Sequence, residues 1–151
     1  MTSLIRPLAY DDFPEWLSLW EDYNAFYGRS GVTSLPSKVT ETTWSRLLDA
    51  SEPMFGLVAV SQSRVIGIAH YLFHRSTSAI EMSCYLQDLF TEKNSRGHGA
   101  GRALIEAVYR AAKAQGTQRV YWHTQESNLL AQKLYDQVAE RSGFIVYRKI
   151  V

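Results

Sequence analysis

The sequence predicts an α/β fold in which helices flank one mixed β-sheet, and three observations support this. Three segments rich in β-branched and aromatic residues follow one another in the middle of the chain, as in an antiparallel meander. Segments with apolar residues at helical spacing lie on both sides of them. The second half then alternates between helical and extended patterns. A chain of 151 residues has the length of one domain, so we expect a single domain over residues 1–151.

The first part of the chain predicts a short strand followed by two helices. Asp11, Asp12 and Pro14 are typical of a helix start, and the apolar side chains after them recur at helical spacing. Glycine, proline and hydroxyl residues at positions 28–37 predict a loop long enough to be functional. Thr40 is expected to cap the second helix. The expected segments are a strand at residues 3–9, a helix from residue 13 and a short helix from residue 40.

The rest of the chain predicts the meander and then two helix–strand pairs. A polar turn at residues 61–64 separates the first two strands of the meander. Gly116 stands where a helix of small residues should end. The whole order is β-α-α-β-β-β-α-β-α-β. The expected strands are residues 55–60, 65–73, 80–90, 120–123 and 144–151, and the expected helices are residues 103–112 and 129–138.

Charge and composition argue against several classes of protein. Sixteen basic and fifteen acidic side chains leave a net charge of +1, which disfavours a nucleic-acid-binding protein. No segment approaches the ~20 apolar residues of a membrane span, and residues 1–10 lack the pattern of a secretory signal. The single cysteine, Cys84, is expected to be a buried thiol. We therefore expect a cytoplasmic protein that binds neither nucleic acid nor membrane.

Two histidines on an expected strand do not predict a metal site. His70 and His74 are four residues apart, which places them about 13 Å apart along a strand at ~3.3 Å per residue. That separation is too large for one metal ion. We expect both side chains on the surface of the sheet.

The most informative segment is a glycine-rich turn between an expected strand and a helix. Gly97, Gly99 and Gly101 lie within it, and such a turn presents unpaired amides and the positive end of a helix dipole. Glycine allows a positive φ and the close approach of a phosphate. A dinucleotide fingerprint would need glycine at Arg102, and the Gly-Lys-Ser/Thr of a nucleotide-triphosphate loop is absent. The turn is suited to a diphosphate of another kind.

The pattern Arg-x-x-Gly-x-Gly at Arg96, Gly99 and Gly101 resembles the GNAT superfamily of N-acetyltransferases, within it the polyamine- and histone-acetyltransferase-like bacterial members. Three further segments match the family in the same order, so that the resemblance covers about residues 85–147. It implies a sheet of six or seven strands with splayed central strands, flanked by four helices. The further segments are Tyr85-Leu86-Gln87-Asp88-Leu89-Phe90, Asn128-x-x-Ala131-x-x-Leu134-Tyr135 and Ser142-Gly143-Phe144.

The resemblance also implies direct transfer of an acetyl group from acetyl-CoA to an amine. In this arrangement Tyr135 would give a proton to the CoA sulfur, and a backbone amide at residues 89–90 would meet the thioester oxygen. Many relatives are homodimers, and residues 144–151 are apolar enough to be a strand edge that needs covering. The implied cofactor-binding residues are Leu89, Phe90, Thr91, Arg96, Gly97, His98, Gly99, Ala100, Gly101, Arg102, Asn128 and Ala131.

The general base is less well defined than the acid. Polyamine acetyltransferases of the superfamily often carry glutamate where this chain has Gln87, and an amide is not a useful base. Asp88 is adjacent, but the alternation of a strand would turn the two side chains to opposite faces. We expect proton removal through ordered water, with Asp88 as the first candidate relay and Glu126 or His123 as others.

The acceptor site is expected in the first half of the chain. In the family the first two helices and their connection commonly form one wall of this site, which makes Tyr23, Tyr27 and the loop at residues 28–37 candidate acceptor contacts. Gln87 of the expected strand is a further candidate contact. Glu21 and Asp22 are either attractants for a cationic amine or part of a solvated helix face. The acceptor is then an amine of a small molecule, a peptide or a protein.

Two other functions remain open from the sequence. Gln87 favours a catalytically inactive acyl-CoA-binding sensor, which would bind the cofactor without turnover. An interaction domain that shares only the fold is the other alternative.

Overall fold

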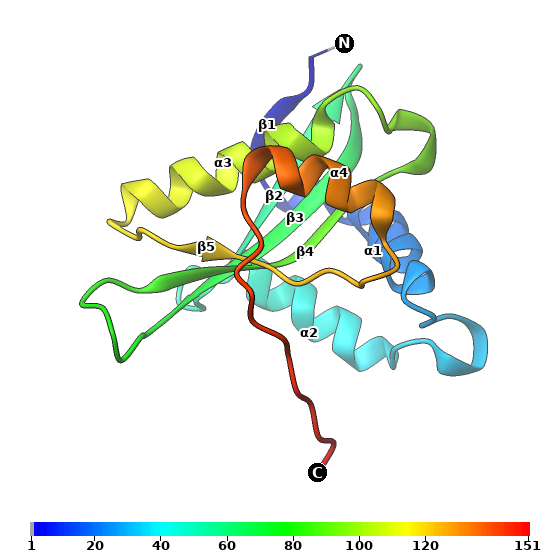
Figure 1. The fold of residues 1–151 in the computed structure, drawn as a ribbon. Coiled ribbons are helices and arrows are strands. Elements are labelled where there is room, and N and C mark those ends of the chain that lie inside the picture. Colours follow the sequence, from blue (N-terminus) through cyan, green and yellow to red (C-terminus); the bar gives the residue numbers. More distant parts are fainter. Residues whose placement is uncertain (1) are drawn as a thin grey trace.

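The computed structural model describes residues 2–151 and shows one five-stranded sheet with four α-helices (Figure 1). Strands β1 to β4 are antiparallel neighbours, and β5 joins β4 in parallel. The predicted α/β class and mixed sheet are confirmed. The elements are β1 (Leu4–Pro7), α1 (Phe13–Phe26), α2 (Ser37–Leu48), β2 (Met54–Ser61), β3 (Arg64–His74), β4 (Ser83–Thr91), α3 (Ala100–Ala114), β5 (Val120–Tyr121) and α4 (Leu129–Val138).

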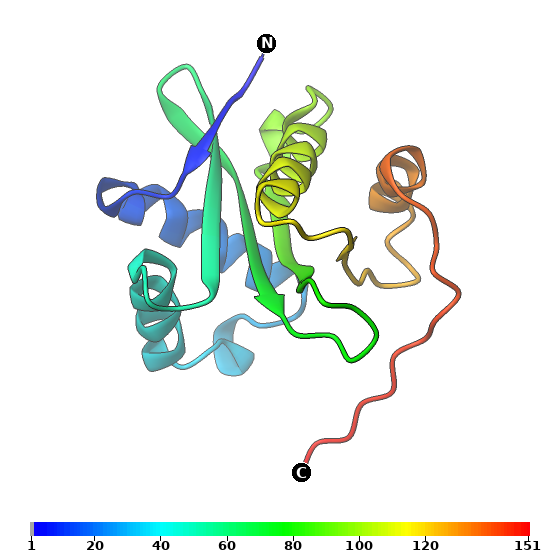
Figure 2. The same cartoon turned by 90° about the vertical axis from the view of Figure 1, so that its left-hand side faces the viewer.

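The sheet separates two apolar cores, as the edge-on view in Figure 2 shows. Helices α1 and α2 cover one face, where Trp16 is fully buried and stacks on Trp20 with ring centroids 5.6 Å apart. Helix α3 covers the other face through Leu104, Ile105 and Val108, all fully buried. Burial of such side chains removes large apolar areas from water and is the main stabilising contribution to the fold.

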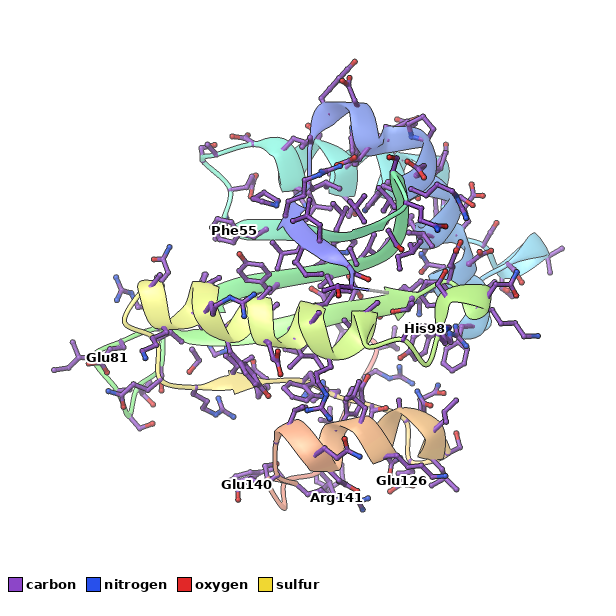
Figure 3. The ribbon with its side chains drawn as sticks, turned by 90° about the horizontal axis from the view of Figure 1, so that it is seen from above. Phe55, Glu81, His98, Glu126, Glu140 and Arg141 are labelled. Atoms are coloured by element: carbon purple, nitrogen blue, oxygen red, sulfur yellow. The ribbon has the colours of Figure 1, made fainter. Side chains whose placement is uncertain are left out.

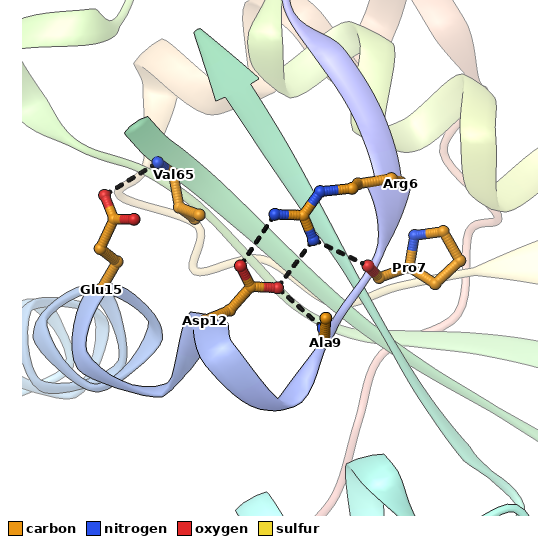
Figure 4. Close-up of polar contacts among 6 residues, drawn as sticks. All are labelled: Arg6, Pro7, Ala9, Asp12, Glu15 and Val65. Atoms are coloured by element: carbon orange, nitrogen blue, oxygen red, sulfur yellow. Dashed lines mark hydrogen bonds and ion pairs between the residues drawn. The ribbon is translucent and has the colours of Figure 1, made fainter. Parts of the chain in front are cut away.

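An ion pair joins β1 to the start of α1 (Figure 4). Arg6 donates two hydrogen bonds of 2.8 Å to the carboxylate of buried Asp12. The same carboxylate accepts from the amide of Ala9 at 2.7 Å. The hydrogen bonds from Arg6 hold the pKa of Asp12 below its usual value. The side chain of Asp12 therefore links Arg6 of β1 and the amide of Ala9 to the start of α1, and it does not cap this helix.

The helix α2 begins earlier than expected. It starts at Ser37, after Pro36, and not at Thr40. The hydroxyl of Thr40 does not cap a helix but accepts a hydrogen bond from the indole of Trp20 at 3.1 Å. The β2–β3 turn is as expected, with Gln62 and Ser63 at positive φ values of 50° and 62°, as two-residue hairpin turns require.

The expected strand at residues 144–151 is not formed. These residues leave the body of the protein and are all exposed (Figures 1 and 2). A strand requires a neighbouring strand edge, and the amide of Phe144 bonds only the hydroxyl of Ser142, at 3.2 Å. The sheet consequently has five strands rather than six or seven.

Cys84 is fully buried in β4, as expected. Burial raises the pKa of its thiol to about 11. Throughout residues 2–151, no helix combines the length and apolarity needed to cross a membrane. The same residues contain no group of three side chains able to hold a metal ion together.

Candidate active site

The strands β4 and β5 pair over two residues and then diverge. Cys84 lies opposite Val120 and Tyr85 opposite Tyr121, and β4 then continues to Thr91 without β5. Within the described chain, the edge of β4 that faces away from β3 has no strand partner beyond Tyr85. Backbone groups on this edge are therefore available to a ligand. The divergence agrees with the splayed central strands that the resemblance to the GNAT superfamily implies.

A pocket lies where the two strands part. It is formed by the end of α1, by β4, by the segment after β5 and by α4. Four residues expected in the acceptor site or in catalysis meet here although they come from distant parts of the sequence. Leu89 and His123 are also present, whereas Leu86 and Trp122 were not expected. The lining residues are Tyr23, Tyr27, Leu86, Gln87, Leu89, Trp122, His123 and Tyr135.

Tyr135 projects from α4 and packs against Trp122 of the segment after β5. The two rings meet edge to face with centroids 5.4 Å apart. Burial, aided by nearby Tyr27, raises the pKa of Tyr135 to about 12. The phenol is therefore protonated at neutral pH and able to act as a proton donor. An apolar pattern around residues 120–122 was the only sequence signal for Trp122, and it did not distinguish a pocket residue from a core residue.

Asp88 lies behind this pocket in contact with a buried histidine. The ring Nδ1 of His70 is 2.9 Å from Oδ2 of Asp88, and His70 is only 3% exposed. The expectation that His70 lies on the sheet surface is therefore wrong, because α1 covers this face and Trp16 packs over the imidazole. Burial and the charge of Asp88 raise the pKa of Tyr23, which lines the pocket.

A β-bulge at Gln87 separates the surroundings of Gln87 and Asp88. His70 pairs with Asp88, but the next residue of β3, Tyr71, pairs with Leu86, so Gln87 has no opposite residue. Before the bulge, Cys84 and Leu86 face the core under α3. After it, Asp88 and Phe90 face α1. The bulge leaves Gln87 exposed in the pocket and turns Asp88 toward His70.

The turn before α3 has the geometry expected of an anion site. Gly97 and Gly99 have φ values of 82° and 87°, a region that other residues enter only at a cost. Both are exposed, at the amino end of a helix of 15 residues, where the first amides have no partner within the helix. Arg96 donates to the carbonyl of Thr91 at 2.9 Å and stacks over Phe90. The turn is therefore suited to an anionic group such as a diphosphate.

The third glycine of the turn, Gly101, lies in α3 on the side that faces α4. A Cβ at Gly101 would meet the Leu134 side chain of α4 at 3.4 Å. Helix α4 lies alongside α3, with Glu126 before α4 toward the same end of the molecule as His98 before α3 (Figure 3). Asn128 caps α4 by accepting from the amide of Ala131 at 3.3 Å.

Of the remaining candidates, His123 lies at the pocket and the three carboxylates do not. Glu21 and Asp22 are exposed on α1, and Glu126 is exposed before α4. None of the three lines the pocket. His123 does line it, with its Nδ1 3.3 Å from the hydroxyl of Tyr85.

Comparison with known proteins agrees with this geometry. The sequence profile of the acetyltransferase (GNAT) family matches residues 15–139. The chain is 34% identical over 148 residues to D-amino-acid N-acetyltransferase HPA3 of Saccharomyces cerevisiae, and the match covers 97% of this chain and 89% of the yeast protein.

Solved structures share the fold at lower identity. The aminoglycoside acetyltransferase AAC(6')-Iy, solved with a CoA-containing bisubstrate analogue, matches over 100% of both chains with a TM-score of 0.82 and 18% identity. The aminoglycoside acetyltransferase meta-AAC0020, from an uncultured soil sample, matches over 99% of this chain and 97% of its own with a TM-score of 0.79 and 20% identity. The chain described here belongs to the GNAT family and is an acetyl-CoA-dependent N-acetyltransferase.

Proposed function

We propose that the acetyl group is transferred to the amine of a small molecule in the pocket between α1, β4 and α4. The observation that carries this proposal is the meeting of Tyr135, Gln87, Tyr23 and Tyr27 around one pocket. Direct transfer requires an amine, an acyl donor and a proton donor within reach of one another. The pocket supplies the donor, and it lies beside the free edge of β4.

Two backbone segments are proposed to hold acetyl-CoA. The amides of residues 96–102 would bind the diphosphate, which the positive φ of Gly97 and Gly99 and the helix dipole support. The backbone of residues 89–91 would bind the pantetheine arm and polarise the thioester carbonyl, as preorganised donors do in other acyl transfers. Asn128, which caps α4, and Ala131 within α4 would line the other side.

Tyr135 is proposed as the general acid. When the thioester carbon–sulfur bond breaks, the departing thiolate requires a proton, and Tyr135 retains one because burial raises its pKa to about 12. Trp122 fixes the ring in place. After transfer the phenolate recovers a proton from solvent.

Asp88 is proposed as the group that receives the proton of the acceptor ammonium. Gln87 lines the pocket but is not basic, so it is proposed to orient the acceptor by hydrogen bonding. Of the other two candidates, Glu126 lies outside the pocket, and His123 lines it at an exposed position. Asp88 is supported by its partly buried contact with His70 and its effect on Tyr23.

The charge beside the pocket supports an acceptor that carries a carboxylate. Arg29 stacks against Tyr27 at 5.4 Å, and its Nε donates to Asn24 at 2.7 Å. Asn24 is itself buried and held by the carbonyl of Trp20. No carboxylate between residues 2 and 151 forms an ion pair with Arg29. The terminal nitrogens of a fixed guanidinium are suited to a carboxylate, and the name of the yeast relative specifies amino acids.

The acceptor class is tested by comparing an amino acid with the amine that lacks its carboxylate. Replacement of Arg29 by glutamine should raise KM for the amino acid on the order of tenfold, because a charge-assisted hydrogen bond is lost. KM for the decarboxylated amine should not change. The exposed Arg110 of α3, replaced in the same way, is the matched control. Equal effects on both acceptors would contradict this assignment.

A sensor that binds acyl-CoA without turnover is the second candidate, favoured by Gln87 in place of a carboxylate. Release of CoA thiol, measured with a chromogenic thiol reagent over a panel of amines, separates the two functions. The enzyme gives thiol release that depends on acceptor concentration. Saturable binding of CoA in calorimetry without thiol release on any amine would favour the sensor.

We also propose a homodimer in the cytoplasm. A run of large apolar side chains is exposed after α4, an arrangement that favours cover by a second copy. Light scattering should give twice the chain mass of 17.2 kDa, and an Ile145→Asp variant should be monomeric. A monomeric wild-type protein would contradict the dimer. The exposed residues are Phe144, Ile145, Val146, Tyr147, Ile150 and Val151.

The free thiol of Cys84 agrees with a reducing compartment such as the cytoplasm. Cell fractionation tests this localisation.

A further inference from the structure

His70 is a buried titratable residue for which the acetyl transfer described so far has no use. Its Nε2 accepts a hydrogen bond from the indole of Trp16 at 3.0 Å, and its Nδ1 lies 2.9 Å from Asp88. An indole nitrogen only donates, so Nε2 has no proton. The proton of the neutral imidazole is therefore on Nδ1 and is donated to Asp88.

The same contact prevents His70 from acting as a base. Protonation of Nε2 would break the bond from Trp16, and both side chains lie in the core under α1. Two buried donors would then face each other without an acceptor, which is costly. His70 is consequently a fixed donor, and a proton that enters this network stays on Asp88.

Tyr23 connects Asp88 to the pocket. It lines the pocket, and its ring stacks on Trp20, whose ring lies 5.5 Å from that of His70, so Tyr23 is on the same face of the sheet as His70 and Asp88. Burial and the charge of Asp88 raise the pKa of Tyr23, which keeps the phenol protonated. The other titratable groups near this pair are Tyr27, Tyr85 and Arg29.

We propose that His70 is a positioning residue that holds Asp88 toward Tyr23, and that the Tyr23 hydroxyl conducts the proton from the acceptor ammonium to Asp88. One N–H bond of the ammonium breaks, and its proton binds the Tyr23 oxygen. The phenol's own proton moves at the same time to the carboxylate. The acceptor becomes a neutral amine and Asp88 a neutral carboxylic acid, so no net charge is created. The inference rests on the proposed function, in which Asp88 is the base.

The geometry supports this route in preference to a purely structural role for His70. The bulge at Gln87 lies between Leu86 and Asp88, and it therefore turns Asp88 to the face of the sheet that carries His70. Without the bulge, Asp88 would point into the apolar core under α3, like Leu86. A bulge that moves a carboxylate beside a pocket is a common device near active sites.

The test compares two acceptors that differ in acidity. One is the best amine of the panel, and the other is its β-fluorinated analogue, whose ammonium gives up its proton more readily. If Tyr23 and His70 assist proton removal, Tyr23→Phe and His70→Leu lower kcat for the ordinary amine on the order of tenfold to a hundredfold. The loss for the fluorinated amine should be several times smaller. Calorimetry should give unchanged affinity for CoA.

Two further variants complete the experiment. His70→Asn restores an amide donor near the position of Nδ1 and should recover part of kcat relative to His70→Leu. Tyr71→Phe removes a buried hydroxyl from the adjacent position of β3, on the face under α3, and should match the wild type for both acceptors.

The outcomes separate the possibilities. An equal loss for both acceptors in Tyr23→Phe would overturn the proton route, and this variant keeps the aromatic ring in place even if His70→Leu fails to fold. Full activity of soluble His70→Leu would overturn the role of His70. Absence of thiol release by the wild-type protein on every amine would instead refute the proposed function itself.

Discussion

Replacement of Tyr135 by phenylalanine should abolish most of the turnover while leaving the fold and CoA binding intact. The change removes one hydroxyl and keeps the ring that packs on Trp122 at 5.4 Å. Loss of a general acid lowers rates by about 10²- to 10⁴-fold, which corresponds to ~2.7–5.4 kcal/mol of transition-state stabilisation at ~1.36 kcal/mol per tenfold. We expect kcat to fall within this range.

The pH dependence follows from the pKa of Tyr135, raised to about 12. The acid form of Tyr135 is fully populated at neutral pH, so its ionisation should not limit kcat until the pH rises toward 12. Steady-state thiol release between pH 6 and 10, at saturating acetyl-CoA, would therefore show no alkaline decline caused by this residue. A decline that disappears in Tyr135→Phe would contradict the raised pKa.

A matched control isolates the hydroxyl of Tyr135 from general effects. Tyr109 of α3 also contacts α4, but its hydroxyl donates to the carbonyl of Val138 at 2.8 Å, outside the pocket. Tyr109→Phe should keep the wild-type kcat. Wild-type kcat in Tyr135→Phe would refute the assignment of the acid.

Three other outcomes are expected. Arg6→Leu should lower the free energy of unfolding in urea by about 1–2 kcal/mol at pH 7, because it leaves the buried carboxylate of Asp12 without its cation. Since Arg6 holds the pKa of Asp12 low, this difference should shrink as the pH falls below about 4. Gly99→Ala should cost about 1–2 kcal/mol because of its φ of 87° and weaken CoA binding in calorimetry, whereas Gly101→Ala, whose Cβ makes an ordinary 3.4 Å contact, should cost less. Cys84 should resist alkylation at pH 7 in the folded protein, because it is buried and its pKa is about 11; rapid modification detected by mass spectrometry would contradict this.

Local signals in the sequence predicted much of this structure. The helical spacing of apolar residues gave the bounds of α4, residues 129–138, correctly, because periodicity depends on neighbouring residues. The glycines of the turn before α3 predicted positive φ values, and Gly97 and Gly99 have them. The pocket positions of Tyr23, Tyr27, Gln87 and Tyr135 followed from the resemblance to the GNAT family, and no pattern within one segment contains that information.

What was not predicted depends on contacts between distant segments. The burial of His70 comes from Trp16, 54 residues away. The bulge at Gln87 depends on the register with β3. Residues 144–151 have the composition of a strand, but composition does not supply a neighbouring edge.

The extra residue in β4 also bears on how this enzyme could be re-engineered. Because Gln87 is opposed by no residue of β3, its side chain can be exchanged without disturbing a cross-strand neighbour. A library at this single codon would sample new acceptors at little cost in folding. Deleting the codon would instead restore a regular pleat in which Asp88, Leu89 and Phe90 keep their present sides, because Leu86 and Asp88 already pair with adjacent residues of β3. Excision would therefore remove the acceptor contact of Gln87 but leave the register of the sheet unchanged.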